Sequence, residues 1–447
     1  MHLKRKAYDR IVEWKERSKG RTALLIDGAR RVGKSYLAEE IGRNEYRSFV
    51  KIDFARASPA VREMFDSDSS DLDMLFSKLS VLSGATLYRR ESLIIFDEVQ
   101  RFPRAREMIK FLVEDGRYDY IETGSLLSIK RNVRDILIPS EEEHMLLHPL
   151  DFEEFLWALG DDATAPLIRR CFERMEPLGE AVHKKAMNLF RQYVLVGGMP
   201  QAVSEYSESR DFASADRVKR MILELYRQDM SKFAEGYEAK VSAVFDQLPA
   251  QLSKREKRFN IASLSKSART RTHEGAFMWL ADGMMINQCF NAVDPTAGLS
   301  MHLDHASRKC YMADTGLLVT HALSDDDFSD NALYKSVLLD ELNISEGMLM
   351  ENAVAQMLRA NGHRLFFYSR SDSADRSNDI EIDFLVRRGG EICPVEVKSG
   401  ASTRHASLDK FVAKFGKRIG RPYVLCAKDL ASGGGVARIP IYMAICL

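Results

Sequence analysis

The stretch GARRVGKS, residues 28–35, decides the fold of the N-terminal part of the chain. It has the spacing of a P-loop: a glycine, four residues, then glycine, lysine and serine. Glycines let the backbone wrap around phosphates, which the amides at the following helix start attract. The spacing predicts binding of ATP, with the alternative of a glycine-containing surface turn. The predicted cofactor-binding residues are Gly28, Ala29, Arg30, Arg31, Val32, Gly33, Lys34 and Ser35.

Two residues of this stretch have separate predicted roles. Lys34 is expected to reach the β- and γ-phosphates of ATP, and the Ser35 hydroxyl is expected to ligate Mg²⁺. The motif also has the context it requires, because the apolar run TALLIDG precedes it and the helical run KSYLAEEIG follows it. ATP and Mg²⁺ are therefore the expected cofactors.

Short apolar runs alternate with helical runs around the P-loop, from residue 20 to about 150. The expected strands are TALLIDG, SFVKIDF, SLIIFDE and YDYIETGS. This alternation is typical of a parallel sheet with crossover helices, and such sheets bind ligands at the carboxyl ends of their strands. We therefore expect residues 1–150 to form an α/β P-loop ATPase domain.

Asp97 and Glu98 follow the apolar residues 93–96 and form a second candidate pair. A buried strand that ends in two acids is the Walker B arrangement, in which Asp97 holds Mg²⁺ and Glu98 polarises the attacking water. A strand merely capped by acids is the alternative. Thr123 and Ser125 end the next strand, where they can contact the γ-phosphate or the water, or can cap a helix.

Composition limits the classes of function. The 447 residues exceed what one hydrophobic core usually organises, so two or three domains are expected. The 65 Lys plus Arg balance 65 Asp plus Glu, so any DNA binding must be local. The six cysteines lack metal-binding spacing and are expected to be reduced core residues. Without a signal-like start or a run of about 18 apolar residues, we expect a cytoplasmic protein without membrane contact.

The pattern changes beyond residue 150. Residues 151–240 are predicted to be helical, and residues 241–325 follow the order helix, helix, helix, strand, strand, which suits a winged helix. Basic residues around these helices would lie near DNA phosphates, or would form an ordinary solvated face. These residues are Lys254, Arg255, Lys257, Arg258, Lys266, Arg269, Arg271 and His273. Residues 326–447 begin with a helix, return to strands and predict a second α/β domain.

The last region holds a second candidate site. Glu396 and Lys398 are two apart in PVEVK and share one face of a strand, which Asp383 in EIDFLV can join. Glu351 lies beside the apolar stripe of its helix and is expected to point inward. Grouped carboxylates repel one another unless a cation joins them. The set predicts a nuclease-like site in which Asp383 and Glu396 bind Mg²⁺ and Lys398 steadies the attacking water, or else an ordinary Glu396–Lys398 pair.

The order of these motifs extends the interpretation to nearly the whole chain. GARRVGKS, IIFDEVQ, ETGS, PLDFEEFLWA, GGMP, YMADTGLL and EIDFLV with PVEVKSG together resemble a family of prokaryotic AAA-type ATPases. The resemblance implies an AAA-like ATPase domain, a winged-helix segment and a C-terminal fold similar to PD-(D/E)XK nucleases. Relatives often carry a Gly-Arg pair after the strand that corresponds to the one ending in Thr123 and Ser125 in this chain. Here Arg131 and Arg134 are the nearest candidates, and no arginine finger is assigned.

Two hypotheses of function follow from the sequence. In the first, ATP binding and hydrolysis switch a nuclease-like, DNA-binding C-terminal domain. In the second, the chain is a regulatory or adaptor ATPase whose nuclease-like domain is catalytically silent and binds a protein or DNA partner. Convergence of Glu351, Asp383 and Glu396 around a metal favours the first hypothesis, whereas scattered acids favour the second. A homo-oligomer is compatible with both.

Overall fold

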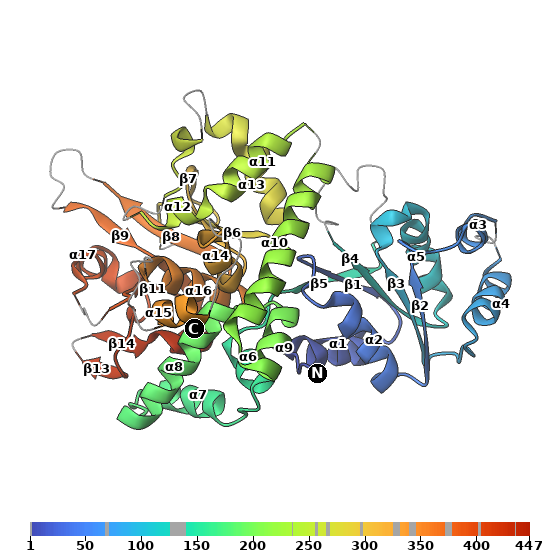
Figure 1. Cartoon of the computed structure of the whole chain (residues 1–447), viewed down its shortest axis with the longest axis horizontal. Helices are drawn as coiled ribbons and strands as arrows, with labels where there is room; N and C mark the ends of the chain where they lie inside the picture. The colour runs from blue at the N-terminus through green and yellow to red at the C-terminus, as the bar shows by residue number, and fades with distance from the viewer. Residues whose placement is uncertain are drawn as a thin grey trace. The chain divides into compact units, whose positions relative to one another are not determined.

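The computed structural model (Figure 1) describes residues 2–67, 71–125, 140–234, 236–254, 258–264, 269–295, 298–324, 331–338, 346–371, 378–400, 404–433 and 435–447. The chain divides into two compact units. The first contains Lys4–His148, and the second contains Pro149–Ala281 and Met285–Leu447. This division lies beside the boundary predicted at residue 150.

The first unit is built on a parallel five-stranded sheet with the order β2-β3-β4-β1-β5. The strands are β1 (Ala23–Gly28), β2 (Ser48–Asp53), β3 (Ser92–Asp97), β4 (Asp119–Gly124) and β5 (Glu142–Leu147). Strands β1, β3 and β4 are buried along their whole length, so both faces of the sheet are covered, as their apolar runs predict. The predicted α/β fold with a parallel sheet is confirmed. The edge strand β5 was not among the predicted strands.

The described helices of this unit lie before β1 and between β1 and β4. They are α1 (Lys6–Ser18), α2 (Lys34–Glu45), α3 (Pro59–Ser67), α4 (Leu72–Ser83), the short η1 (Val99–Arg101) and α5 (Pro103–Asp115). Phe54, Phe65 and Phe96 pack edge to face beside the end of β3, with ring centroids 5.5 or 5.6 Å apart. This aromatic cluster fixes the strand end from which Asp97 projects.

The second unit begins with a helical segment, as predicted for residues 151–240. Its helices are α6 (Phe152–Ala158), α7 (Thr164–Arg174), α8 (Glu180–Val196), α9 (Pro200–Ser209) and α10 (Phe212–Phe233). Asp151 and Glu154 form a capping box at the start of α6, where each side chain accepts a hydrogen bond from the backbone N–H of the other residue. The motif PLDFEEFLWA is therefore a helix start.

Two further motifs contact each other in this unit. Gly198 of GGMP donates its N–H to the Asp314 carboxylate of YMADTG, at 2.6 Å. A Cβ atom at Gly198 would lie 2.0 Å from the Leu150 carbonyl oxygen, and one at Gly316 would lie 2.2 Å from the Val196 carbonyl oxygen. Both glycines therefore allow close backbone approach, which explains these motifs by packing.

The segment predicted as a winged helix contains helices followed by two strands, as expected. One of these strands, however, also pairs with a strand outside the segment. The segment contains α11 (Glu238–Asp246), α12 (Leu248–Leu252), the 3₁₀ turn η2 (Ile261–Ser263), α13 (Thr270–Asp282), β6 (Ile286–Ala292), β7 (Leu303–Met312) and α14 (Thr315–Ala322). Strand β6 pairs with β7 and also with β8 (Leu365–Arg370), which gives the sheet order β7-β6-β8-β9. The regions predicted as 241–325 and 326–447 therefore share a sheet. The two-stranded hairpin of β6 and β7 would be only marginally stable by itself, and the added strands complete it.

The C-terminal segment adds a second sheet. Its described elements are α15 (Asn331–Leu338), α16 (Glu346–Ala360), β9 (Ile380–Ile382), β10 (Phe384–Arg388), β11 (Glu391–Val397), α17 (Ala406–Phe415), η4 (Gly416–Arg418), β12 (Tyr423–Cys426), β13 (Ala431–Gly433), β14 (Val436–Pro440) and η5 (Ile441–Cys446). The mixed sheet has the order β10-β11-β12-β14-β13. Phe384 pairs with Val395, which places the adjacent residues Asp383 and Glu396 at one level of the sheet. None of the described helices is long and apolar enough to cross a membrane.

Candidate nucleotide site and C-terminal acidic cluster

The P-loop forms a concave turn between β1 and α2. Arg31 and Gly33 have positive φ angles of 69° and 97°. Such a turn directs successive backbone amides towards one point and makes an anion-binding nest. A Cβ atom at Gly28 would lie 2.6 Å from the Leu147 carbonyl oxygen, so glycine is required at the loop start. Helix α2 begins at Lys34, which adds the positive end of a helix dipole.

Lys34 is folded back into this loop. Its ammonium group donates to the carbonyl oxygens of Gly28 at 2.7 Å and Ala29 at 3.0 Å. Burial lowers the pKa of Lys34 to about 8, although the charges of Asp27, Glu98 and Asp97 oppose this change. The lysine is thus held by neutral acceptors, and phosphate oxygens would give it stronger, charged partners.

Asp97 collects three donors at the end of β3. Ser35 donates from its hydroxyl at 2.6 Å and Thr123 donates to the same carboxylate oxygen. Lys51 lies 2.7 Å from the other oxygen and 2.8 Å from Glu39. Burial raises the pKa of Asp97, but the hydrogen bonds from Lys51, Ser35 and Thr123 outweigh it and lower the pKa below the ordinary value. Asp97 is therefore ionised at neutral pH.

The structure brings the sequence-predicted residues Lys34, Ser35 and Asp97 together and adds Lys51. Strand β4 lies between β1 and β3, and this order places Thr123 against Asp97. Ser125, the predicted catalytic residue of this strand, lies half-buried just beyond its end. Sequence reasoning missed Lys51, whose only local signal is a lysine inside the expected strand SFVKIDF.

Glu98 follows Asp97 on the same rim of the sheet. It has a positive φ angle of 53°, is half-buried and accepts a hydrogen bond from Gln100 at 2.6 Å. The donor set fits Mg²⁺, because a hydroxyl and a carboxylate that already touch supply the oxygen ligands this ion prefers. The candidate arginines Arg131 and Arg134 lie outside the described residues.

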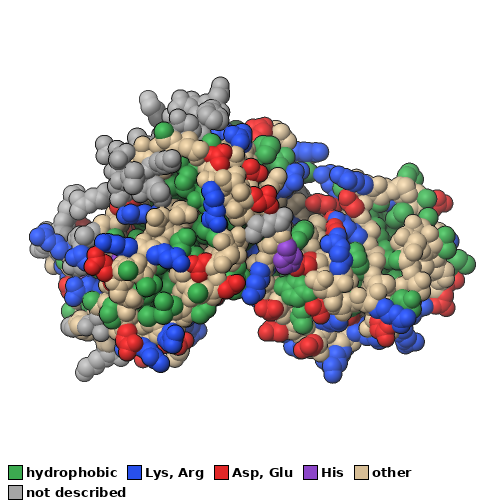
Figure 2. All heavy atoms as spheres, turned by 60° about the horizontal axis from the view of Figure 1, so that its bottom comes forward, with side chains coloured by type: hydrophobic (Ala, Val, Ile, Leu, Met, Phe, Trp, Pro, Cys, Tyr) green, Lys and Arg blue, Asp and Glu red, His purple; other side chains and the backbone are tan. Residues whose placement is uncertain are grey.

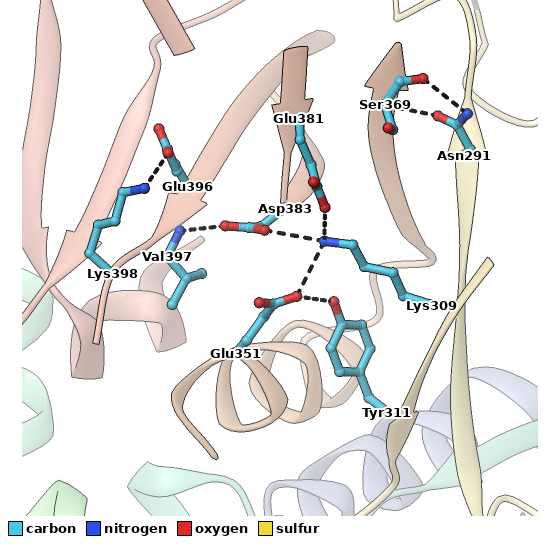
Figure 3. A network of polar contacts seen from close by, with 10 residues as sticks. All are labelled: Asn291, Lys309, Tyr311, Glu351, Ser369, Glu381, Asp383, Glu396, Val397 and Lys398. Carbon is cyan, nitrogen blue, oxygen red and sulfur yellow. Dashed lines mark hydrogen bonds and ion pairs between the residues drawn. The ribbon is translucent and has the colours of Figure 1, made fainter. Parts of the chain in front are cut away.

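The C-terminal carboxylates converge, but on a lysine (Figure 3). The Lys309 ammonium nitrogen lies 3.4 Å from Glu351, 3.1 Å from Glu381 and 3.2 Å from Asp383. Lys309 is 1% exposed. Burial lowers its pKa, but Glu351, Asp383 and Glu381 outweigh that effect and raise the pKa well above the ordinary value. Tyr311 donates to the same Glu351 oxygen at 2.5 Å.

Glu396 does not join the cluster around Lys309, which differs from the predicted metal site. It accepts a hydrogen bond from Lys398 at 2.5 Å, the ordinary pair that the sequence left open. Burial raises the pKa of Glu396, although Lys398 lowers it. The second oxygen of Asp383 accepts the Val397 N–H at 2.9 Å. In the described part of the chain, no group of three or more His, Cys, Asp or Glu residues is placed to hold a metal ion.

The predicted Mg²⁺ ligands Asp383 and Glu396 therefore do not fit a metal in this arrangement. The reason is Lys309 on β7, which the sequence pattern assigned to a different domain. Because β7 joins the sheet of β8 and β9, its lysine enters the acidic cluster. Glu351 points inward, as its helical stripe predicted.

The basic residues predicted to face DNA are divided. Lys254, Arg269 and Arg271 are exposed, whereas Arg258 is half-buried. His273 is buried at 7% exposure, with its ring nitrogen 3.2 Å from the Arg269 carbonyl oxygen, so its predicted place near phosphates is wrong. Arg255, Lys257 and Lys266 lie outside the described residues. On the face drawn in Figure 2, acidic and basic side chains are interspersed.

Comparison with known families divides the chain into three matched segments. Residues 20–156 match the family described as AAA domain. Residues 187–328 and 346–443 match two domains of unknown function, DUF8612 and DUF4143. No curated protein sequence matches the chain.

Two solved structures are distantly similar to the chain. The ORC1 protein of Aeropyrum pernix in complex with DNA is 14% identical, with coverage of 73% of this chain and 94% of that chain and a TM-score of 0.28. A signal transduction ATPase with numerous domains from Pyrococcus horikoshii is 13% identical, with 80% and 46% coverage and the same TM-score. The chain thus spans under half of that protein. The family match at residues 20–156, the parallel sheet and the P-loop together support an AAA-type domain in this part of the chain.

Proposed function

We propose that the chain binds ATP with Mg²⁺ at the P-loop and hydrolyses it. The observation that carries this proposal is the meeting of Lys34, Ser35, Asp97 and Thr123 at the carboxyl ends of three neighbouring strands. Mg²⁺, when bound, supplies positive charge to the β- and γ-phosphate oxygens. Ser35 and Asp97 would hold it.

Each side chain then has a defined task. The amides of the P-loop and the start of α2 bind the phosphates, and Lys34 exchanges its two carbonyl partners for phosphate oxygens. Lys51 leaves Asp97, because the metal needs the same carboxylate. Glu98 orients and polarises the attacking water as a general base. Thr123 keeps Asp97 in place and gives β4 a contact that reports on the nucleotide state.

The direct test is ATP binding by Lys34→Ala beside the matched control Lys78→Ala, an exposed lysine on α4. The phosphates lose their buried ammonium partner in the first variant, so we expect affinity to fall by about 10- to 100-fold, the scale of hydrogen bonds to charged groups. Lys78→Ala should bind like the wild type. Equal affinity of Lys34→Ala and wild type would overturn the assignment of the site.

We further propose that the nucleotide state switches the second unit. Support comes from the combination, in one chain, of an AAA-type domain with two more segments that match families of their own. The proposed effector is the nuclease-like C-terminal segment, with DNA or a protein as partner. A cytoplasmic location and formation of a homo-oligomer belong to the same proposal.

A second candidate function is an adaptor whose nuclease-like segment is catalytically silent. The position of Lys309 between Glu351 and Asp383 favours it, because a lysine occupies the centre that a catalytic metal would need. Cleavage of single-stranded, duplex and branched DNA, with Mg²⁺ and with or without ATP, separates the two functions. The switchable nuclease predicts cleavage that Asp383→Asn abolishes, and the adaptor predicts no cleavage.

A further inference from the structure

We infer that Lys309 is a built-in counter-ion that takes the place of a metal in the acidic cluster of Glu351, Glu381 and Asp383. The cluster then joins the segment around β7 to the C-terminal segment without any divalent cation. This inference concerns the second unit alone and is independent of the proposed ATP hydrolysis.

The participants come from separate elements (Figure 3). Lys309 and Tyr311 are two apart on β7 and share one face of that strand. Glu351 belongs to α16, Glu381 to β9, and Asp383 lies between β9 and β10. These carboxylates reach Lys309 only when α16 packs against β7 and the sheet with the order β7-β6-β8-β9 has formed. The ammonium therefore stabilises the assembled unit and not a local turn.

The geometry uses the full capacity of the ammonium group. A protonated lysine has three N–H donors, and one carboxylate oxygen lies within 3.4 Å of Nζ from each of Glu351, Glu381 and Asp383. The side chain also lies over the Phe367 ring, with Nζ 5.3 Å from its centroid. Lys309 is 1% exposed, so its charge is shielded from water and depends on these carboxylates.

A metal would need the same position. Mg²⁺ binds oxygen at about 2.0–2.1 Å, so it would have to lie between the same carboxylates and beside a positive charge. The second carboxylate oxygen of Asp383 also accepts a hydrogen bond from the Val397 N–H, and Glu396 is paired with Lys398. The cluster can therefore become a metal site only if the lysine charge is removed.

The test is Mn²⁺ titration of the full chain without nucleotide, by calorimetry and by thermal melting. The variants are Lys309→Met, Lys309→Met with Asp383→Asn, and the control Lys414→Met, an exposed lysine that donates to Tyr368 in the same unit. We expect Lys309→Met to melt at a lower temperature and to recover when Mn²⁺ is added. The double variant should lose that recovery. Wild type and Lys414→Met should show no melting shift with Mn²⁺.

Three results would overturn the inference. The first is Mn²⁺ binding by the wild type that Asp383→Asn removes. The second is Lys309→Met that is as stable as the wild type, and the third is a destabilised Lys309→Met that Mn²⁺ does not restore. If Lys309→Met does not fold, Glu351→Gln in the wild-type background replaces it. That variant must melt below the wild type, because Lys309 loses a charged partner, and an unchanged or higher melting temperature contradicts the inference.

Discussion

Each unit contains a lysine that lies against a carboxylate predicted to bind Mg²⁺, yet the two lysines differ in burial and in partners. Lys51 has a side-chain exposure of 27% and contacts Asp97 and Glu39. Lys309 has 1% exposure and contacts three carboxylates. In the proposed function, Lys51 would turn to solvent when Mg²⁺ and ATP bind, whereas the burial of Lys309 would hold it in the cluster. We therefore propose that similar acidic patterns in the sequence belong to a site with an exchangeable lysine and to a cluster with a fixed lysine.

The largest expected effect tests the catalytic half of the comparison. Glu98→Gln keeps the shape of the side chain and removes its ability to act as a base, so ATP binding should persist while turnover falls by about 10²- to 10⁴-fold. Steady-state hydrolysis and binding of a fluorescent ATP analogue measure both quantities. Gln100→Ala is the control, because Gln100 donates a hydrogen bond to Glu98 but has no acidic or basic group of its own. Wild-type turnover by Glu98→Gln would move the catalytic role to another residue.

The sequence predicted the parts of the fold and the site that depend on residues close together in the chain. GARRVGKS predicted the P-loop because its strand, turn and helix are contiguous, and the Asp97 position followed from one apolar run. The parallel sheet followed from alternating runs in the same way. Strand β5 was not predicted because its segment Glu142–Leu147 begins with two acids and its apolar run is limited to Met145, Leu146 and Leu147.

The sequence was not informative where a contact depends on the pairing of distant strands. Lys51 reaches Asp97 because β2 lies beside β3, and Lys309 lies 42 to 74 residues from Glu351 and Asp383. No spacing rule connects such positions. Glu396 lies on β11 as predicted, whereas Asp383 lies between β9 and β10. The identity of the cation was not predicted, because Lys309 comes from a strand that the pattern assigned to a winged helix.

Measurements of the free energy of unfolding test the role proposed for Lys309 in the acidic cluster. Lys309→Met leaves the buried Glu351 and the more exposed Asp383 and Glu381 without their counter-charge. Because the pair with Glu351 is buried, the free energy of unfolding should fall by about 3–5 kcal/mol, as for other broken buried ion pairs. Urea denaturation monitored by circular dichroism measures this loss. Addition of Asp383→Asn should recover part of it, and a loss below that of exposed lysine variants would contradict the assigned role.

A smaller effect is expected at Lys51. Lys51→Met removes a partly exposed pair, so the free energy of unfolding should fall by only about 0.2–1 kcal/mol. The same variant removes the competitor of Mg²⁺ at Asp97, so Mg²⁺ with ATP should bind at least as tightly as in the wild type. Calorimetric titration checks the affinity. Strongly weakened binding would show that Lys51 is a ligand-binding residue and not an exchangeable partner.

The smallest expected effect is a change in the protonation of Lys34 when ATP binds. Unlike Lys51 and Lys309, Lys34 donates hydrogen bonds to carbonyl oxygens. Its pKa is lowered to about 8 in the ligand-free site, so at pH 9 it is mostly neutral. Bound phosphates raise that pKa, and ATP binding at pH 9 should therefore take up a fraction of a proton and weaken relative to pH 7. Calorimetry in two buffers of different ionisation enthalpy measures the uptake. Proton release, or identical enthalpies in both buffers, would contradict the low pKa.

The most direct measurement counts Mn²⁺ sites by electron paramagnetic resonance in the full chain, with and without a non-hydrolysable ATP analogue. The account predicts one tight Mn²⁺ site that requires the analogue, is lost in Asp97→Asn and persists in Asp383→Asn. An analogue-independent site that Asp383→Asn removes would contradict it, because the C-terminal cluster would then hold a metal in spite of Lys309.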